Sequence, residues 1–167
     1  MPLRPALPAD ADAIAAIYNH YILTTTISFE EEPVDGAEIA RRMQSVQSAK
    51  LPYLVAEDDG VVTGYAYATP WRVRRAYRSS VETSVYVQDG RHVRGTGTAL
   101  YRLLLAQLTD GGYHLAIGGI AQPNAASVAL HEKLGFEKVA HFREVGRKFG
   151  HWIDVDYWQL ILNEDHR

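Results

Sequence analysis

The sequence predicts an α/β domain with a mixed sheet, and three observations lead to this prediction. The chain has 167 residues, 47% of them hydrophobic, which suits one domain with a sizeable core. Segments with strand and helix periodicity follow in the order β-α-α-β-β-β-α-β-α-β-β, without repeats or linkers. A strand, a glycine-bearing loop and a helix occur in succession past mid-chain, which indicates a parallel strand pair there and antiparallel strands before it. We therefore expect one domain over residues 1–167.

The first elements are a short extended start and two helices. Residues 3–7 begin the chain, and Pro8 is suited to a helix entry. Apolar residues at helical spacing then predict a helix over 10–23. The segment 24–32 (TTTISFEEE) has no helical period and is interpreted as a loop or short extended piece. A second amphipathic helix is predicted over 34–47.

Three strands are predicted next, over 52–57, 61–69 and 80–87. The sequence DDG at 58–60 is typical of a hairpin turn, so the first two strands are antiparallel neighbours. A basic stretch without a period, RVRRAYR at 72–78, connects the second strand to the third.

The last part of the chain alternates helices and strands again. A helix over 94–108 precedes the apolar run HLAIGGI, which suits a buried parallel strand at 114–120. A helix at 125–134 ends at a glycine, as left-handed helix stops often do. Two closing strands, 137–143 and 152–162, are predicted with a loop between them.

Composition excludes several classes of function. The net charge is −3 and the isoelectric point about 6.1, so nothing indicates general binding of nucleic acid. The absence of cysteine excludes disulfides, thiolate nucleophiles and cysteine-based metal sites, and we expect no metal. No apolar run approaches the roughly 20 residues that span a bilayer, and the N-terminus has no apolar signal core. A soluble cytoplasmic protein without membrane partners is the expectation.

The loop RHVRGTGTAL could bind a phosphate, because it connects a strand to a helix N-terminus. A nucleoside-triphosphatase loop would need a Gly-Lys-Ser/Thr sequence, which is absent. A dinucleotide fingerprint would need a third glycine beyond Gly95 and Gly97, near the start of the chain. By itself this loop is better explained by a simple strand-to-helix turn than by a ligand site.

A second motif changes that interpretation. HVRGTG, followed by Asn124, Ser127 and HEKLGF at 131–136, resembles the paired acyl-CoA motifs of the GNAT N-acetyltransferases. The runs VETSVYV, LHEKLGF and FREVGRKFGHWIDVDYWQ are similar to the phosphinothricin and methionine sulfoximine acetyltransferase branch, over about residues 1–163. His92 stands where the family has Gln or Arg, and Val93 where it often has glycine. The resemblance implies the GNAT fold, with a parallel pair that splays apart and about four flanking helices.

The resemblance also implies acetyl-CoA as co-substrate and a set of residues that hold it. The main chain of the strand end would hold the pantetheine arm, and the loop amides would bind the pyrophosphate. Lys133 would meet a CoA phosphate, or would only stabilise the helix dipole. The cofactor-binding residues are then Val85, Tyr86, Val87, Val93, Arg94, Gly95, Thr96, Gly97, Thr98, Asn124, Ser127 and Lys133.

Two residues are catalytic candidates by the resemblance. Glu82 shares a strand face with Ser84 and would be the base that deprotonates the amine, directly or through water. The alternative is a salt bridge to an arginine of 72–78. His131 would reprotonate the leaving thiol, although a histidine on an apolar helix face is as often a satisfied core residue. Tyr101 is a second candidate for that acid, better explained by packing.

The acceptor is expected at the arginine-rich connection, where four arginines stand within seven residues. Arginine matches carboxylate and phosphinate groups well. With the resemblance, this predicts acetylation of the α-amine of a small amino acid analogue, of the phosphinothricin, methionine sulfoximine or methionine sulfone type. The alternatives are another amine, such as a peptide N-terminus, and a CoA-binding module without catalysis. Substrate-binding residues would be Phe29, Arg72, Val73, Arg74, Tyr77, Glu82, Thr83 and Ser84.

The aromatic C-terminal segment bears on assembly. Trp152, Tyr157 and Trp158 would form a subunit interface, and the branch that the chain resembles is commonly dimeric. The alternative is an ordinary core strand. We therefore predict a homodimer.

Overall fold

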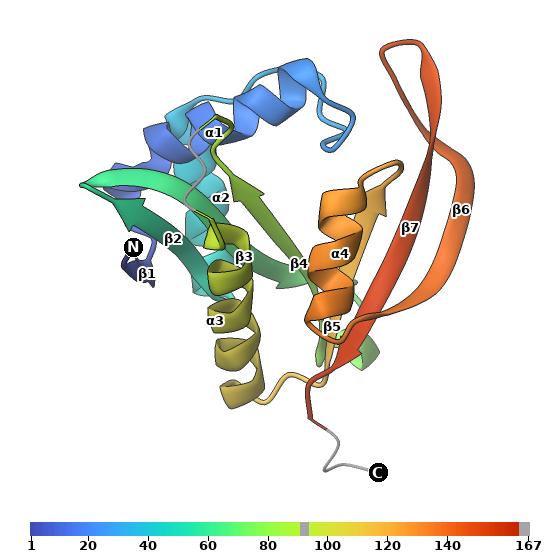
Figure 1. Cartoon of the computed structure of the whole chain (residues 1–167). Helices are drawn as coiled ribbons and strands as arrows, with labels where there is room; N and C mark the ends of the chain where they lie inside the picture. The colour runs from blue at the N-terminus through green and yellow to red at the C-terminus, as the bar shows by residue number, and fades with distance from the viewer. Residues whose placement is uncertain (91–93, 164–167) are drawn as a thin grey trace.

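The computed structural model describes residues 1–90 and 94–163, which form a seven-stranded mixed sheet in the order β1-β2-β3-β4-β5-β7-β6 (Figure 1). Only the β4–β5 pair is parallel, and every other neighbouring pair is antiparallel. The predicted mixed sheet is thus confirmed. The strands are β1 (Leu3–Pro5), β2 (Tyr53–Asp58), β3 (Val61–Pro70), β4 (Ser80–Val87), β5 (Leu115–Ala121), β6 (Glu137–Lys148) and β7 (His151–Ile161).

Four α-helices cover the two faces of the sheet. They are α1 (Ala11–Thr24), α2 (Gly36–Ser48), α3 (Thr96–Asp110) and α4 (Ala125–Lys133). Figure 1 shows α3 and α4 on one face, while α1 and α2 lie on the other. Two short 3-10 helices, η1 (Pro8–Asp10) and η2 (Arg75–Tyr77), precede α1 and β4.

The core lies between the first strands and the helices on both sides. α3 buries Leu100, Leu104 and Leu108 against small residues of β3 such as Ala66. On the opposite face, the buried Ile14 of α1 belongs to the same cluster. Because both faces of β2 and β3 are covered, these strands read as nearly continuous apolar runs in the sequence.

The parallel pair comes apart after three residue pairs. Ser80, Val81 and Glu82 pair with Leu115, Ala116 and Ile117, and no further pairing of β4 with β5 follows. β4 nevertheless continues to Val87, and β5 to Ala121. The sheet therefore contains an internal gap whose edges carry backbone groups that the neighbouring strand does not bind. This is the splayed pair that the family resemblance implies.

The last hairpin differs from the expectation. The strand predicted over 137–143 continues to Lys148, so the predicted loop before β7 is only a short turn. An irregularity between Phe142 and Gly146, with Glu144 at a φ of 52°, interrupts the alternation that marks a strand in the sequence. The resulting long hairpin rises beside the connection between α1 and α2 (Figure 1).

Candidate active site

A cavity of about 1090 Å³ lies between the α1–α2 connection, β4, β5 and the β6–β7 hairpin. Its floor is the face of the sheet that carries α1, and its walls combine hydroxyl-bearing and apolar side chains. Sequence reasoning placed Phe29, Arg72, Glu82 and Ser84 around an acceptor pocket, and these four residues line this cavity. Other lining residues are Tyr18, Ile27, Ser28, Glu30, Tyr67, Trp71, Tyr86, Phe142, Val145 and Tyr157.

Glu82 is a half-buried carboxyl on β4. Burial raises its pKa above the ordinary value, and the nearby positive charge of Arg72 partly offsets this. No ion pair involves Glu82 within the part of the chain that the structure describes, although the sequence left a salt bridge open. A carboxyl with a raised pKa in a cavity is suited to accept a proton near neutral pH.

The arginine-rich connection contributes one side chain to the cavity. The guanidinium of Arg72 lies 4.6 Å from the ring centroid of Trp71, beside Glu82. Arg74 and Tyr77 are exposed, Val73 is fully exposed, and none of the three is among the residues that line the cavity. The sequence did not indicate which side chains of this connection point into the cavity, because the segment has neither strand nor helix period.

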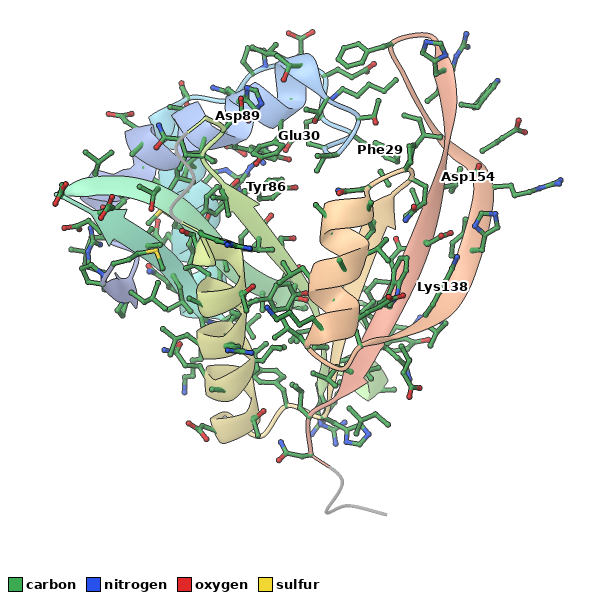
Figure 2. All side chains as sticks on the ribbon, viewed as in Figure 1. Phe29, Glu30, Tyr86, Asp89, Lys138 and Asp154 are labelled. Atoms are coloured by element: carbon green, nitrogen blue, oxygen red, sulfur yellow. The ribbon has the colours of Figure 1, made fainter. Side chains whose placement is uncertain are left out.

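The roof of the cavity joins two segments that are far apart in the sequence. Phe29 packs so closely on Gly146 that a Cβ added there would lie 2.3 Å from the ring. Lys148, which is 1% exposed, donates a 2.6 Å hydrogen bond from Nζ to the backbone oxygen of Ser28. Figure 2 shows Phe29 on the α1–α2 connection, on the side that faces the hairpin. Sequence reasoning missed Gly146 and Lys148, since nothing local marks a contact across more than 100 residues.

A network of charges and hydroxyls holds the other side of the roof. Glu30 receives two hydrogen bonds from the guanidinium of Arg42, at 2.7 and 2.9 Å, and another from the hydroxyl of Tyr18. The hydroxyl of Tyr18 also lies 2.8 Å from that of Ser28. Arg42 holds the pKa of Glu30 below its ordinary value, so this carboxylate is ionised and paired.

A smaller cavity of about 60 Å³ occupies the gap between β4 and β5. It shares Ser84, Tyr86 and Gly119 with the larger cavity, so the two spaces adjoin. The remaining lining includes Thr83, which the sequence assigned to the acceptor, and four residues that it assigned to the cofactor or to catalysis, namely Val85, Asn124, Ser127 and His131. The gap therefore brings the strand run VETSVYV and the motif from Asn124 to HEKLGF together.

Two consecutive glycines make room for aromatic rings on both faces of β5 at this gap. A Cβ on Gly118 would lie 2.4 Å from Nε2 of His131. A Cβ on Gly119 would lie 2.9 Å from the ring of Tyr157, on the cavity side. The dipeptide thus allows His131 and Tyr157 to approach the strand from opposite sides.

Both ring nitrogens of His131 have partners. Nδ1 lies 2.8 Å from the backbone oxygen of Ser127, which can only accept, so Nδ1 carries a proton. Nε2 lies 2.9 Å from the hydroxyl of Tyr101, which also contacts Thr83. In the neutral ring, Nε2 therefore accepts a hydrogen bond from the Tyr101 hydroxyl. Burial lowers the pKa of His131, so the neutral form is favoured, and Tyr101 packs within this network as well as against Phe136.

The glycine loop leads into α3 beside the gap. Gly95 is the N-cap residue with a φ of 94°, a left-handed conformation that glycine adopts without strain. A Cβ on Gly97 would lie 3.5 Å from Val87 and 3.8 Å from Leu130, so the helix begins between β4 and α4. Thr96 and Thr98 belong to the same first turn, and Arg94 is exposed before it. Val93 lies outside the described residues.

The remaining cofactor candidates lie on α4 and on the end of β4. Asn124 is the N-cap residue of α4 and accepts a 3.1 Å hydrogen bond from the backbone of Ser127. Lys133 is exposed at the last turn of this helix. The hydroxyl of Tyr21 donates to the backbone oxygen of Val87 at 2.5 Å. This last contact, which nothing in the sequence indicated, fixes the strand end next to the helix N-terminus.

These residues fit acetyl-CoA. The gap between β4 and β5 offers strand-edge backbone groups to the extended pantetheine arm. The N-terminus of α3 lies beside this gap, and its free backbone amides would stabilise the pyrophosphate anion. Within the described residues, no group of three or more His, Asp or Glu side chains could hold a metal ion. None of the described helices is long and apolar enough to cross a membrane.

The chain is similar to known acetyltransferases in family and in sequence. The model of the acetyltransferase (GNAT) domain matches residues 3–156. A phosphinothricin N-acetyltransferase of Streptomyces viridochromogenes is 42% identical over 94% of this chain and 85% of its own length. An L-methionine sulfoximine/L-methionine sulfone acetyltransferase of Salmonella typhimurium is 40% identical over 98% of this chain and 96% of its own length.

Solved structures show the same architecture. An acetyltransferase structure from Salmonella typhimurium, with its cofactor acetyl-CoA, superposes with a TM-score of 0.97 at 39% identity. It covers 100% of this chain and 96% of its own. A GNAT superfamily phosphinothricin acetyltransferase from Sinorhizobium meliloti, in complex with acetyl-CoA, gives a TM-score of 0.94 at 38% identity. That match covers 98% of this chain and 89% of the other.

Proposed function

Because this chain belongs to the GNAT acetyltransferase family and is an acetyl-CoA-dependent N-acetyltransferase, we propose that it acetylates the α-amine of a small amino acid analogue. The acceptor is of the phosphinothricin, methionine sulfoximine or methionine sulfone type, as for the relatives named above. The observation that carries this proposal is that Arg72 and Glu82 line one cavity, which adjoins the β4–β5 gap. An amino acid presents a carboxylate and an amine to match this pair.

The reaction needs a neutral amine, a polarised thioester and a protonated leaving thiol. Acetyl-CoA, when bound, supplies an activated acetyl thioester. Glu82 takes a proton from the ammonium group of the acceptor, directly or through water, so that the amine can form the new N–C bond. Arg72 holds the acceptor carboxylate, and Ser84 and Thr83 lie next to Glu82 on the strand. Backbone donors of Val85 to Val87 polarise the thioester carbonyl.

The cofactor residues act mainly through the backbone. The amides of residues 93–98 bind the pyrophosphate, with Arg94 adding positive charge from outside. Asn124 and Ser127 meet the arm at the start of α4, and Lys133 meets a phosphate. The assignments of Val73, Arg74 and Tyr77 to the acceptor stay predictions, since these residues are exposed outside the cavity.

The leaving thiolate takes its proton in the gap, as the C–S bond breaks. His131 lines this gap, and the hydroxyl of Tyr101 binds its Nε2. As the C–S bond breaks, the protonated ring of His131 gives its Nε2 proton to the thiolate, which forms the free thiol and leaves the neutral ring with its proton on Nδ1 and Tyr101 beside Nε2. We keep His131 as the catalytic acid in this proposal.

The decisive experiment is a thiol-release assay with acetyl-CoA and methionine sulfone, followed by mass spectrometry of the product. We expect one acetyl group on the α-amine and a large loss of kcat in Glu82→Gln. The exposed Glu132→Gln is a matched control, which should keep full activity. Thiol release with a peptide N-terminus but not with amino acids would favour the second acceptor class, and CoA binding without turnover would favour a binding module.

We also propose a homodimer whose interface includes the hairpin. Phe142, Val145, Phe149 and Trp152 are each 48% to 60% exposed, which is a large apolar surface for one hairpin. By contrast, Trp158 is buried in the core and Tyr157 faces the cavity, so only Trp152 of the three predicted interface residues is available. Sedimentation should give a dimer that Trp152→Ser weakens and Val61→Ser, on β3, does not. A wild-type monomer would refute this.

The same proposal includes a place of action. The enzyme works in the cytoplasm, where acetyl-CoA is available, as one domain that needs no metal, membrane or nucleic acid. The family match over residues 3–156 supports the single domain. Cell fractionation and activity in the presence of a chelator would test these points.

A further inference from the structure

We propose that Trp71 and Tyr157 are positioning residues of the acceptor site, which hold the guanidinium of Arg72 where it can bind the acceptor carboxylate. This inference rests on the proposed function, and it adds two residues that the sequence motifs did not assign to the acceptor. Both residues act through Arg72, so they orient the acceptor without taking part in the proton transfers.

Arg72 needs such support, because few contacts restrain its side chain. The residue is exposed, although it lines the large cavity. With the described residues, 1–90 and 94–163, its side chain forms neither an ion pair nor a hydrogen bond. A free arginine side chain samples many rotamers, whereas binding a carboxylate through both arms of the guanidinium selects one. A contact that already restricts the side chain lowers the entropic cost of binding.

The indole ring of Trp71 supplies this contact. Cζ of Arg72 lies 4.6 Å from the ring centroid. This is within the range of about 6 Å in which a guanidinium is attracted to the face of an aromatic ring. The backbone N–H of Trp71 donates a 3.2 Å hydrogen bond to the carbonyl oxygen of Ser80, at the start of β4. The backbone of Trp71 is therefore tied to the sheet, and its indole gives Arg72 a fixed surface.

Tyr157 on β7 supports the indole in turn. The rings of Trp71 and Tyr157 meet edge to face, with centroids 5.7 Å apart and an interplanar angle of 73°. The ring of Phe142 on β6 meets that of Tyr157 in the same manner, at 5.8 Å and 90°. Aromatic pairs prefer this geometry, and all three rings line the large cavity. The aromatic rings thus connect the β6–β7 hairpin to the side chain that binds the acceptor.

Gly119 on β5 makes room for this arrangement. It is the residue that pairs with Tyr157, and a Cβ there would lie 2.9 Å from the tyrosine ring. The ring can therefore lie against β5 on the face that carries the cavity. Burial raises the pKa of Tyr157, and the charges of Glu82 and Arg72 act on it as well. This agrees with a ring that lies next to the two charged groups of the acceptor site.

The two aromatic residues stand apart from the hydrophobic core. Trp71 and Tyr157 are half-buried, and neither belongs to the core cluster or to the partly buried side chains that pack against it. The core lies instead under the helices, around residues such as Leu100 and Ile14. Truncation of Trp71 should therefore affect the acceptor site more than the stability of the fold.

The test measures the KM values for methionine sulfone and for acetyl-CoA in Trp71→Leu and Trp71→Phe. We expect Trp71→Leu to raise the acceptor KM about three- to tenfold, the effect of losing a cation–π contact, with an unchanged KM for acetyl-CoA. Trp71→Phe keeps an aromatic face and should recover most of the loss. Tyr113→Leu is the matched control, because Tyr113 is a half-buried aromatic residue that lines neither the large cavity nor the gap. It should leave both KM values unchanged.

A double-mutant cycle shows whether the effect runs through Arg72. In an Arg72→Gln background, Trp71→Leu has no guanidinium to release, so kcat/KM for the acceptor should change less than about twofold. Tyr157→Leu should likewise lower kcat/KM in the wild-type background and not in Arg72→Gln. Equal factors in the two backgrounds would overturn the inference, because the aromatic residues would then act independently of Arg72. An unchanged acceptor KM in Trp71→Leu would overturn it as well.

Failure of the proposed function would give a different result. If the wild type acetylated no amino acid, the proposed function would fail, and calorimetry with CoA present would decide the inference. Weaker binding of methionine sulfone to Trp71→Leu than to the wild type would support it. Equal dissociation constants, or no binding to either protein, would overturn it.

Discussion

Replacing Glu82 with glutamine tests whether this carboxyl is a working base or a structural residue. The amide has nearly the same shape but takes up no proton at neutral pH, so the hydrogen-bonding surface of β4 is kept. General base catalysis contributes about 10²- to 10⁴-fold, which corresponds to about 3–5 kcal/mol of the activation barrier. We expect kcat to fall within this range, with little change in the KM for acetyl-CoA, because the cofactor contacts lie elsewhere.

The pH dependence gives an independent measure. Burial raises the pKa of Glu82 in the folded protein, so the acid limb of kcat/KM should lie above the ordinary glutamate value. A raised folded pKa means that the folded protein holds this proton more tightly, which favours folding at low pH. That contribution is lost as the pH rises through the folded pKa. At pH 7 the ionised carboxyl therefore lowers the free energy of unfolding.

The variant should therefore be less active and more stable. Thermal unfolding at pH 7 should give a higher Tm for Glu82→Gln than for the wild type, with the gap closing as the pH falls below the folded pKa. Glu132→Gln, an exposed site, should shift neither property. Loss of both activity and stability at pH 7 would refute the argument, because it would mean that Glu82 makes a favourable structural interaction when ionised.

Three further substitutions test the rest of the site. Gly118→Ala would press a methyl group on the His131 ring, 2.4 Å away, and should cost about 1–3 kcal/mol in urea unfolding; an unchanged midpoint would contradict the packing. Gly97→Ala should stabilise α3 by up to about 1 kcal/mol but raise the KM for acetyl-CoA, and an unchanged KM would argue against pyrophosphate at this amide. Arg72→Lys should raise the acceptor KM about tenfold without affecting that of acetyl-CoA, since a lysine loses the forked pair of hydrogen bonds.

Much of the fold was predictable because it is encoded locally. Hydrophobic period, the DDG turn and the glycine after α4 place most helix and strand ends within about two residues of their expected positions. The strand 137–143 was predicted too short, because the irregularity near Glu144 hides the period of β6. Such interruptions depend on the neighbouring strand, which the local sequence does not describe.

Site residues that belong to sequence motifs could be predicted, whereas contacts between segments that are distant in the sequence could not. Glu82, Asn124 and His131 belong to runs that a resemblance can identify, and the structure brings all three to the cavities. The roof contact of Phe29 with Gly146 joins residues that no local pattern relates. Similarly, four arginines in succession suggest a strongly cationic pocket, whereas the irregular backbone directs only Arg72 inward.

The incomplete pairing of β4 with β5 affects the stability of the enzyme when no cofactor is bound. An unpaired strand edge inside a sheet is open to water, so its amide hydrogens should exchange quickly in the free enzyme. A bound arm would act as the missing strand and slow that exchange at Val85 and Val87, whose amides alternate with that of Tyr86 and face away from β3. At a concentration one hundred times its Kd, acetyl-CoA would also add about 2.7 kcal/mol to the free energy of unfolding. Acetyl-CoA would then set the stability of this enzyme as well as its rate, and the Tm should rise with the concentration of the cofactor.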